Sequence, residues 1–139
     1  MNITLEIDPS SGFCPGVVRA VRQAEDYLAL HDTLHSLGPI VHNSLEIDRL
    51  MAKGLQIVDL KSIDSIAGGV LLIRAHGEPP STYELAAAKG IILIDCTCPV
   101  VLRLQKEVRK AFLRMESVGG TVVIFGKHGH AEVNGLVGQ

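Results

Sequence analysis

The sequence lacks the features that mark several large classes of protein. Its 13 Lys and Arg residues are balanced by 15 Asp and Glu residues, which gives a formal charge of −2 at pH 7. A nucleic-acid-binding domain usually carries clustered positive charge, so we expect no nucleic-acid partner. No apolar run approaches the roughly 18–20 residues that a transmembrane helix needs, so we expect no membrane partner.

Cysteine is also scarce, and its spacing excludes the common uses of cysteine pairs. The 139 residues include three cysteines, and one residue separates Cys96 from Cys98. An odd number with this spacing is not a disulfide framework, and it matches neither a CxxC redox motif nor a zinc knuckle. The first residues also lack the basic and apolar pattern of a signal peptide. We therefore expect reduced thiols and a cytoplasmic location.

The sequence does contain an alternation of strand-like and helix-like segments. Apolar runs that favour strands lie at 2–7, 38–41, 55–58, 70–73, 91–94 and 121–125. Amphipathic stretches that favour helices begin near Pro15, after Asn43, at Ser81 and after Pro99. This alternation is typical of βαβ units, whose parallel strands form a sheet covered by helices. We predict that residues 1–139 form a single three-layer α/β domain with a mostly parallel sheet.

Side chains capable of chemistry follow nearly every predicted strand. They are Cys14, His42, His76, Cys98, His130 and Glu132. The carboxyl ends of parallel strands meet at one edge of a sheet, where open α/β folds bind ligands. Helices predicted to begin after Cys14, His42 and Cys98 add partial positive charge and free N–H donors at that edge. We therefore expect one crevice that suits a phosphate or diphosphate, with thiols that suit iron or zinc.

Each of these residues also has a simpler interpretation when it is taken alone. A lone cysteine is more often a small buried residue than a metal ligand, and a loop histidine often caps or is solvated. Their recurrence after successive strands favours a shared site instead. Two alternatives without catalysis remain open at this point. One is a phosphate-binding module without a metal cluster, and the other is a zinc site formed by Cys14, Cys98, His76 and His130.

The candidate residues lie in five short motifs, which in chain order are GFCPGV at 12–17, VHN at 41–43, AHG at 75–77, DCTCP at 95–99 and GHAEV at 129–133. These motifs resemble those of the LytB/IspH family of 4-hydroxy-3-methylbut-2-enyl diphosphate reductases. They cover nearly the whole chain, but members of the family are considerably longer. Those members resemble a trefoil of three similar α/β domains around one iron–sulfur cluster. The resemblance implies that this chain is the first of the three domains.

The resemblance also implies a role for each residue. Cys14 and Cys98 would be two of the three cysteine ligands of a [4Fe–4S] cluster, with the third ligand outside this chain. Cys96 stands where the family often has a small residue, so it receives no ligand role. The substrate-binding residues would be His42, His76 and His130. Glu132 would be the catalytic residue that delivers a proton.

The implied reaction is the reductive dehydroxylation of 4-hydroxy-3-methylbut-2-enyl diphosphate to isopentenyl diphosphate and dimethylallyl diphosphate. It is the last step of the non-mevalonate (MEP) isoprenoid pathway. The implied partners are this small-molecule diphosphate, the remaining two domains, and reduced ferredoxin or flavodoxin as electron donor. The implied location is the bacterial cytoplasm, or the plastid stroma for a plant-type source. We expect this chain alone to be inactive and to expose apolar surface where the other domains would contact it.

Overall fold

The computed structural model describes residues 3–139, and its centre is a parallel sheet. The strands of this sheet are β1 (Leu34–Leu37), β2 (Leu55–Val58), β3 (Val70–Ile73) and β4 (Ile92–Asp95). They pair in the order β2-β1-β3-β4, and every pair is parallel. The predicted α/β class with a mostly parallel sheet is therefore confirmed. The bounds of β2 and β3 are also as predicted.

Helices connect the strands and begin at residues that the sequence marks clearly. They are α1 (Pro15–Leu28), α2 (Ser44–Met51), the 3₁₀ helix η1 (Leu60–Ile66), α3 (Pro80–Ala88), α4 (Pro99–Glu116) and α5 (Ala131–Val137). Proline lies in the first turn of α1, α3 and α4, where its fixed φ suits a helix and no N–H is needed. The Asn43 side chain accepts a hydrogen bond from the Glu46 backbone N–H at 3.1 Å and caps α2.

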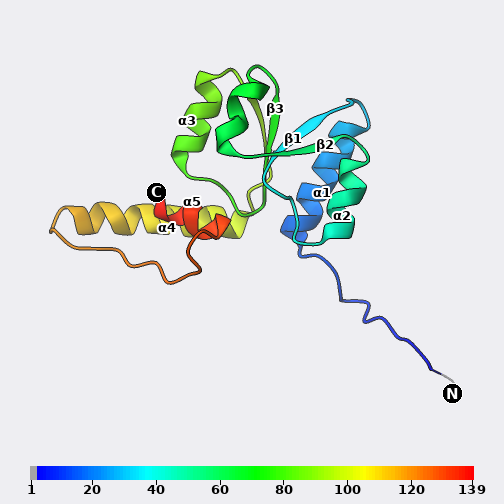
Figure 1. Ribbon diagram of the computed structural model, residues 1–139. Helices are drawn as coiled ribbons and strands as arrows, with labels where there is room; N and C mark the ends of the chain where they lie inside the picture. The colour runs from blue at the N-terminus through cyan, green and yellow to red at the C-terminus, as the bar shows by residue number, and fades with distance from the viewer. Residues whose placement is uncertain (1–2) are drawn as a thin grey trace.

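Two hydrophobic clusters cover the two faces of the sheet and make three layers (Figure 1). On one face, Ala24 of α1 and Leu50 of α2 pack in a cluster with Leu72 of β3. On the other face, Ala86 of α3 packs in a cluster with Leu71 of β3, together with residues of η1. Successive residues of a strand point to opposite faces, so neighbouring leucines of β3 serve different layers.

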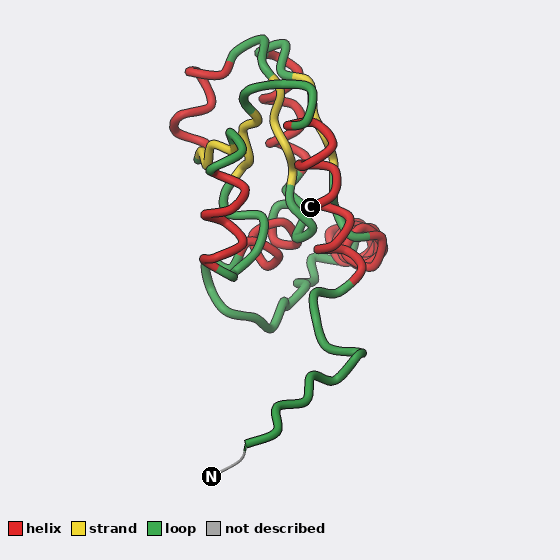
Figure 2. The backbone as a smooth tube through the Cα atoms, turned by 90° about the vertical axis from the view of Figure 1, so that its right-hand side faces the viewer, coloured by secondary structure: helices red, strands yellow, loops and turns green. Residues whose placement is uncertain are grey.

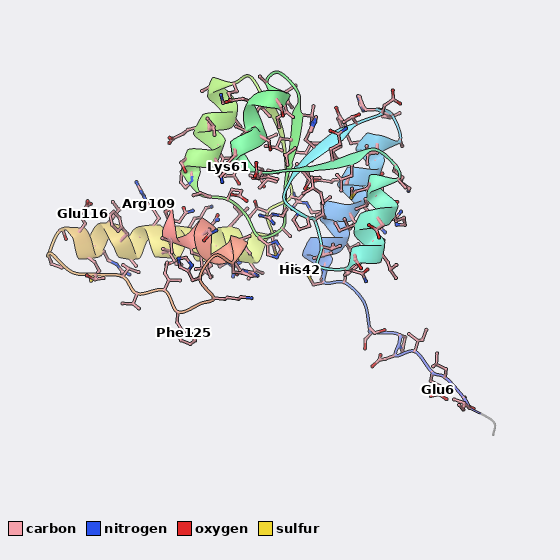
Figure 3. The ribbon with its side chains drawn as sticks, in the orientation of Figure 1. Glu6, His42, Lys61, Arg109, Glu116 and Phe125 are labelled. Atoms are coloured by element: carbon pink, nitrogen blue, oxygen red, sulfur yellow. The ribbon has the colours of Figure 1, made fainter. Side chains whose placement is uncertain are left out.

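The helices α4 and α5 lie side by side at the edge of this layered body (Figure 1). Between them, residues 117–130 run back along α4 as an extended segment, and Phe125 points away from both helices (Figure 3). Within residues 3–139, we find no helix with both the length and the apolar character that crossing a bilayer requires.

The strands predicted at 2–7 and 121–125 are absent from the described part of the chain. Residues 3–7 extend away from the body (Figure 2), and the side chains of Ile3, Leu5 and Ile7 are 81%, 83% and 78% exposed. Asn2 lies outside the described residues. Residues 121–125 form no ladder, and Phe125 is fully exposed. Both segments have a strand-like pattern but no partner strand among residues 3–139, and a strand needs a partner for its backbone hydrogen bonds.

The strand predicted at 38–41 lies a few residues earlier, as β1. The residue that follows β1 is Gly38, whose φ of +75° turns the chain out of the extended conformation. Pro39 then offers no N–H to a ladder. Ile40 and Val41 are nonetheless buried, so their apolar character reflects packing in a loop and not strand pairing.

Candidate functional site

The sheet order creates a change of winding direction between β1 and β3. The chain leaves β1 for β2 on one side of it, and then returns to place β3 on the other side. The helices that follow β1 and β3 cover opposite faces, so the two loops diverge at the carboxyl edge of the sheet. Open α/β sheets bind ligands in the crevice at such a point. His42 lies in the loop after β1 and His76 in the loop after β3.

Three histidines from distant parts of the chain meet at this crevice. The ring centroids of His42 and His76 are 5.6 Å apart, and those of His76 and His130 are 5.5 Å apart. The rings of His42 and His130 are separated by 6.2 Å. One ring nitrogen from each residue lies within 4.8 Å of the other two. The chain contributes His130 from the residue that precedes α5, and Figure 3 labels His42 near the starts of α1 and α2.

The surroundings of His76 favour a neutral imidazole. Burial lowers its pKa, and the positive charges of Arg74, His130 and His42 lower that pKa further, while Glu132 acts in the opposite direction. The Nδ1 atom is buried and has no hydrogen-bond partner within residues 3–139. A neutral imidazole donates one N–H and accepts at its other nitrogen, so it can bind a phosphate oxygen without itself reacting.

Cys14 and Cys98 occupy equivalent positions at the starts of two helices. They are the N-cap residues of α1 and α4, and neither side chain caps its helix. A Cβ at Gly16 would lie 3.3 Å from both Cβ and Sγ of Cys98, so the first turn of α1 packs directly on this cysteine. Cys14 is exposed and Cys98 is partly exposed. A helix N-terminus stabilises a thiolate, so both sulfurs suit metal binding.

Cys96 differs from Cys14 and Cys98 in its surroundings. It is fully buried in the cluster between α1 and the sheet. Its Sγ donates a hydrogen bond to the Gln23 Oε1 at 2.7 Å. Burial raises the pKa of Cys96 to about 11, so the thiol stays protonated at neutral pH. It is therefore a packing residue, in agreement with the absence of a predicted ligand role.

Glu132 lies in the first turn of α5, two residues after His130, and is partly buried. Its negative charge acts on His76, which places the carboxylate in the electrostatic range of the histidine cluster. The dipole of α5 also favours a carboxylate at this position. A carboxyl group therefore lies within electrostatic range of the histidines.

The histidines, and not the cysteines, form the group of potential metal ligands. Among residues 3–139, the side chains that come together as three potential ligands are His42, His76 and His130. Cys14 and Cys98, which the alternative zinc site would combine with His76 and His130, lie outside this group.

A basic cavity of about 330 Å³ opens beside the histidines. It is lined by His42, Arg74, Lys127, His128, Gly129, His130, Ala131 and Asn134. None of these residues is acidic. Arg74 and Asn134 are not among the site residues predicted from the sequence. The available signal for Arg74 was a charged residue between the aliphatic strand Val70–Ile73 and the AHG motif.

These features define a class: an open, parallel α/β domain with a basic, histidine-rich crevice at its switch point and accessible thiols at two adjoining helix starts. Within that class, the family can be stated. The model of the LytB protein family matches residues 6–139, and the chain belongs to this family.

Named relatives agree with this assignment. The chain is 53% identical over 138 residues to the 4-hydroxy-3-methylbut-2-enyl diphosphate reductase of Porphyromonas gingivalis, covering 99% of this chain and 48% of that protein. It is 51% identical over 137 residues to the protein of the same name from Bacteroides thetaiotaomicron, with 99% and 47% covered. The chain thus spans about half the length of the curated relatives it matches.

Solved structures share the fold. The E-1-hydroxy-2-methyl-but-2-enyl-4-diphosphate reductase of Plasmodium falciparum matches with a TM-score of 0.82 and 30% identity, over 94% of this chain and 40% of that chain. A structure titled (E)-4-hydroxy-3-methyl-but-2-enyl diphosphate reductase, the terminal enzyme of the non-mevalonate pathway, matches with a TM-score of 0.70 and 38% identity. That match covers 91% of this chain and 43% of the other. The family resemblance predicted from the five motifs is confirmed.

Proposed function

We propose that this chain is part of an iron–sulfur reductase that converts 4-hydroxy-3-methylbut-2-enyl diphosphate to isopentenyl diphosphate and dimethylallyl diphosphate. The observation that carries the proposal is the meeting of His42, His76 and His130 at the switch point of a LytB-family fold. The names of the relatives support the same reaction and pathway. The chain spans about half of those relatives. We propose, as the family resemblance implies, that two further α/β domains complete the site.

In this proposal, the histidines bind the diphosphate end of the substrate. One ring nitrogen of each imidazole lies within 4.8 Å of a ring nitrogen of each of the other two. Hydrogen bonds to charged oxygens are stronger than those between neutral groups, so three N–H donors can hold one phosphate firmly. Burial lowers the pKa of His76 and so favours its neutral state. A neutral imidazole offers one N–H and one lone pair for hydrogen bonds and carries no charge that a partner must balance.

The donor set fits a [4Fe–4S] cluster whose third cysteine comes from outside this chain. Cys14 and Cys98 are accessible, lie on adjoining segments and precede helices that stabilise thiolates. When bound, the cluster would supply electrons and an open iron that acts as a Lewis acid toward the substrate hydroxyl. Reduced ferredoxin or flavodoxin is the proposed electron donor. The sequence relatives named above are bacterial, which supports the cytoplasm over the plastid stroma as the proposed location.

Glu132 is the proposed proton donor. Departure of a hydroxyl group as water requires a proton. The proposal is supported by the electrostatic effect of the Glu132 carboxylate on His76, one of the proposed substrate-binding residues. The histidines hold the substrate, and the carboxyl group delivers the proton.

Cluster binding by defined cysteines tests the proposal. The full-length protein is expressed without oxygen, supplied with iron and sulfide, and examined for iron content and for the electron paramagnetic resonance of the reduced cluster. We expect Cys14→Ser and Cys98→Ser to lose most of the bound iron, while Cys96→Ala, the matched control, keeps it. A colourless wild-type protein that retains affinity for diphosphate would instead establish the phosphate-binding module without a cluster.

A further inference from the structure

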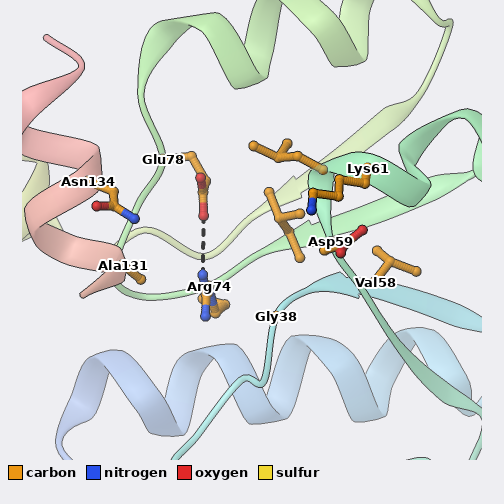
Figure 4. Close-up of a pocket in the computed structure, with 10 residues that line it drawn as sticks. Gly38, Val58, Asp59, Lys61, Arg74, Glu78, Ala131 and Asn134 are labelled. Atoms are coloured by element: carbon orange, nitrogen blue, oxygen red, sulfur yellow. Dashed lines mark hydrogen bonds and ion pairs between the residues drawn. The ribbon is translucent and has the colours of Figure 1, made fainter. Parts of the chain in front are cut away.

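Arg74 occupies the boundary between two cavities at the candidate site. It directly follows β3 and lines the basic cavity beside His42 and His130. It also lines a neighbouring cavity of about 330 Å³, into which Lys61 and Asp59 project from the opposite wall (Figure 4). The Arg74 side chain is 15% exposed. Because arginine remains charged throughout the physiological pH range, a permanent cation lies largely buried beside the histidine cluster.

The hydrogen-bonding capacity of Arg74 is largely unused. Its contact with a carboxylate is a single one, from Nη2 to Oε1 of Glu78 at 3.4 Å (Figure 4), which is longer than an ordinary charged hydrogen bond. The Nε atom is buried and has no partner within the described part of the chain. A buried cation with unpaired donors is costly, and a bound anion would satisfy those donors.

The guanidinium group is also held in place before any ligand arrives. It lies against Gly38 in the loop after β1, where a Cβ would lie 2.5 Å from Nη1 and 2.7 Å from Cζ. The φ of +75° at Gly38 favours glycine at this point as well. Because the group is fixed between this backbone and Glu78, little conformational freedom would be lost when it binds an anion.

The proposed substrate needs such a charge. A diphosphate carries several negative charges, and an arginine side chain, unlike a histidine, stays positively charged throughout the physiological pH range. Lys127 is the other permanent cation that lines the basic cavity, but it is an exposed residue. We infer that Arg74 is an anion-binding residue of this site and supplies the fixed positive charge for the diphosphate that His42, His76 and His130 hydrogen-bond. This inference rests on the proposed function.

The affinity of this chain for inorganic pyrophosphate, measured by titration calorimetry at pH 7.5 and low salt, tests the inference. We expect Arg74→Gln to weaken binding at least tenfold and Arg74→Lys to stay within about threefold of the wild type, because the charge is kept. Arg114→Gln, which removes an arginine in the last turn of α4, is the matched control and leaves the affinity unchanged. Urea unfolding of each variant accompanies the titrations.

A variant that gains affinity separates binding from folding. Glu78→Gln removes the carboxylate that competes for Arg74, so we expect it to tighten pyrophosphate binding several-fold. The double variant Arg74→Gln/Glu78→Gln loses that gain if the effect acts through Arg74. A purely structural ion pair predicts weaker or unchanged binding for Glu78→Gln.

The outcomes distinguish the inference from the proposed function. If His76→Asn abolishes pyrophosphate binding while Arg74→Gln binds like the wild type, the diphosphate site stands and the role of Arg74 is refuted. Equal weakening by Arg74→Gln and Arg114→Gln would reduce the effect to net charge and refute the inference. If the wild-type chain binds no pyrophosphate, both the role of Arg74 and the diphosphate site proposed for this chain fail.

Discussion

At the scale of single residues, the three cysteines carry the same thiol group but lie in different environments. Cys14 is exposed at the start of α1, Cys98 is partly exposed at the start of α4, and Cys96 is buried under α1. The short spacing between Cys96 and Cys98 does not by itself indicate which of the two thiols is accessible for metal binding. Alternation within a strand would place residues two apart on the same face, but β4 ends at Asp95, so Cys96 and Cys98 can face different neighbours.

This difference predicts the order of thiol alkylation. With iodoacetamide at pH 7.5, we expect Cys14 to react first, Cys98 more slowly, and Cys96 only after unfolding. With a pKa of about 11, Cys96 is a thiolate in fewer than about one molecule in a thousand at this pH, and it is also inaccessible. Mass spectrometry of timed samples measures the three rates. Equal rates for Cys96 and Cys14 would contradict the assigned environments.

Gly77 is a second residue whose surroundings determine the site. Its φ is +70°, and a Cβ there would lie 2.8 Å from both Gln105 Nε2 and Thr97 Cγ2. Gln105 and Thr97 are buried, so neither can move away freely. Gly77 therefore allows the loop that carries His76 to approach α4.

We expect Gly77→Ala to lower the free energy of unfolding by about 2–5 kcal/mol, the sum of left-handed backbone strain and overpacking. Gly90→Ala is the matched control, because Gly90 has φ +65° but nothing within 4 Å of a Cβ. It should cost only about 1–2 kcal/mol, from the backbone alone. Urea unfolding of both variants measures the difference. A Gly77→Ala variant no less stable than Gly90→Ala would show that the close approach is absent.

At the scale of elements, local signals predicted α1, α2, α3 and α4, but not η1 or α5. They also gave two strands, at 2–7 and 121–125, that the described part of the chain does not form. The Asn43 cap and the prolines of α1, α3 and α4 act within one turn, so the sequence reveals them. The apolar segments at 3–7 and 121–125 have the composition of strands, but pairing is decided by distant residues. Arg74 was not predicted as a site residue for a similar reason. The two cavities that it lines form only after β1, β3 and α5 meet.

Ion pairs between α1 and α2 illustrate how elements are held relative to each other. Glu25 of α1 accepts hydrogen bonds from Lys53 at 2.6 Å and from Arg49 of α2 at 2.5 Å. These two partners lower the pKa of Glu25 from 4.5 to about 2. A lowered carboxyl pKa stabilises the fold fully above pH 4.5, and this contribution is lost as the pH falls toward 2.

We therefore expect Glu25→Gln to destabilise the chain at pH 7 by less than about 1 kcal/mol, since the pair lies at the surface. The difference from the wild type should shrink between pH 4.5 and pH 2. Urea unfolding at several pH values measures it, with Glu116→Gln, an exposed carboxyl at the end of α4, as the control. A difference that grew on acidification would have the wrong sign for this account.

At the scale of the whole molecule, several large apolar side chains are exposed on two extended segments. Ile3, Leu5 and Ile7 are largely exposed, as are Val123 and Phe125 on the segment between α4 and α5. Large exposed apolar patches usually mark contacts with other parts of a protein. The chain spans about half the length of the relatives it matches.

This surface predicts association of the isolated chain. We expect its mass in analytical ultracentrifugation to rise with concentration, and Ile7→Ser combined with Phe125→Ser to reduce that rise. Ser10→Ala, on the exposed segment before α1, serves as a control that leaves it unchanged. A wild-type chain that stays monomeric at all concentrations, without binding a hydrophobic dye, would contradict the prediction.

The proposed reductase activity is tested most directly by measuring turnover of 4-hydroxy-3-methylbut-2-enyl diphosphate by the full-length protein with its cluster and by its Glu132→Gln variant. We predict that the wild type forms isopentenyl and dimethylallyl diphosphate. We predict that Glu132→Gln binds the substrate with similar affinity and loses at least about a hundredfold in rate. Near-normal turnover by Glu132→Gln would remove Glu132 from the mechanism. Absence of turnover by a wild-type protein that holds its cluster would contradict the proposed function itself.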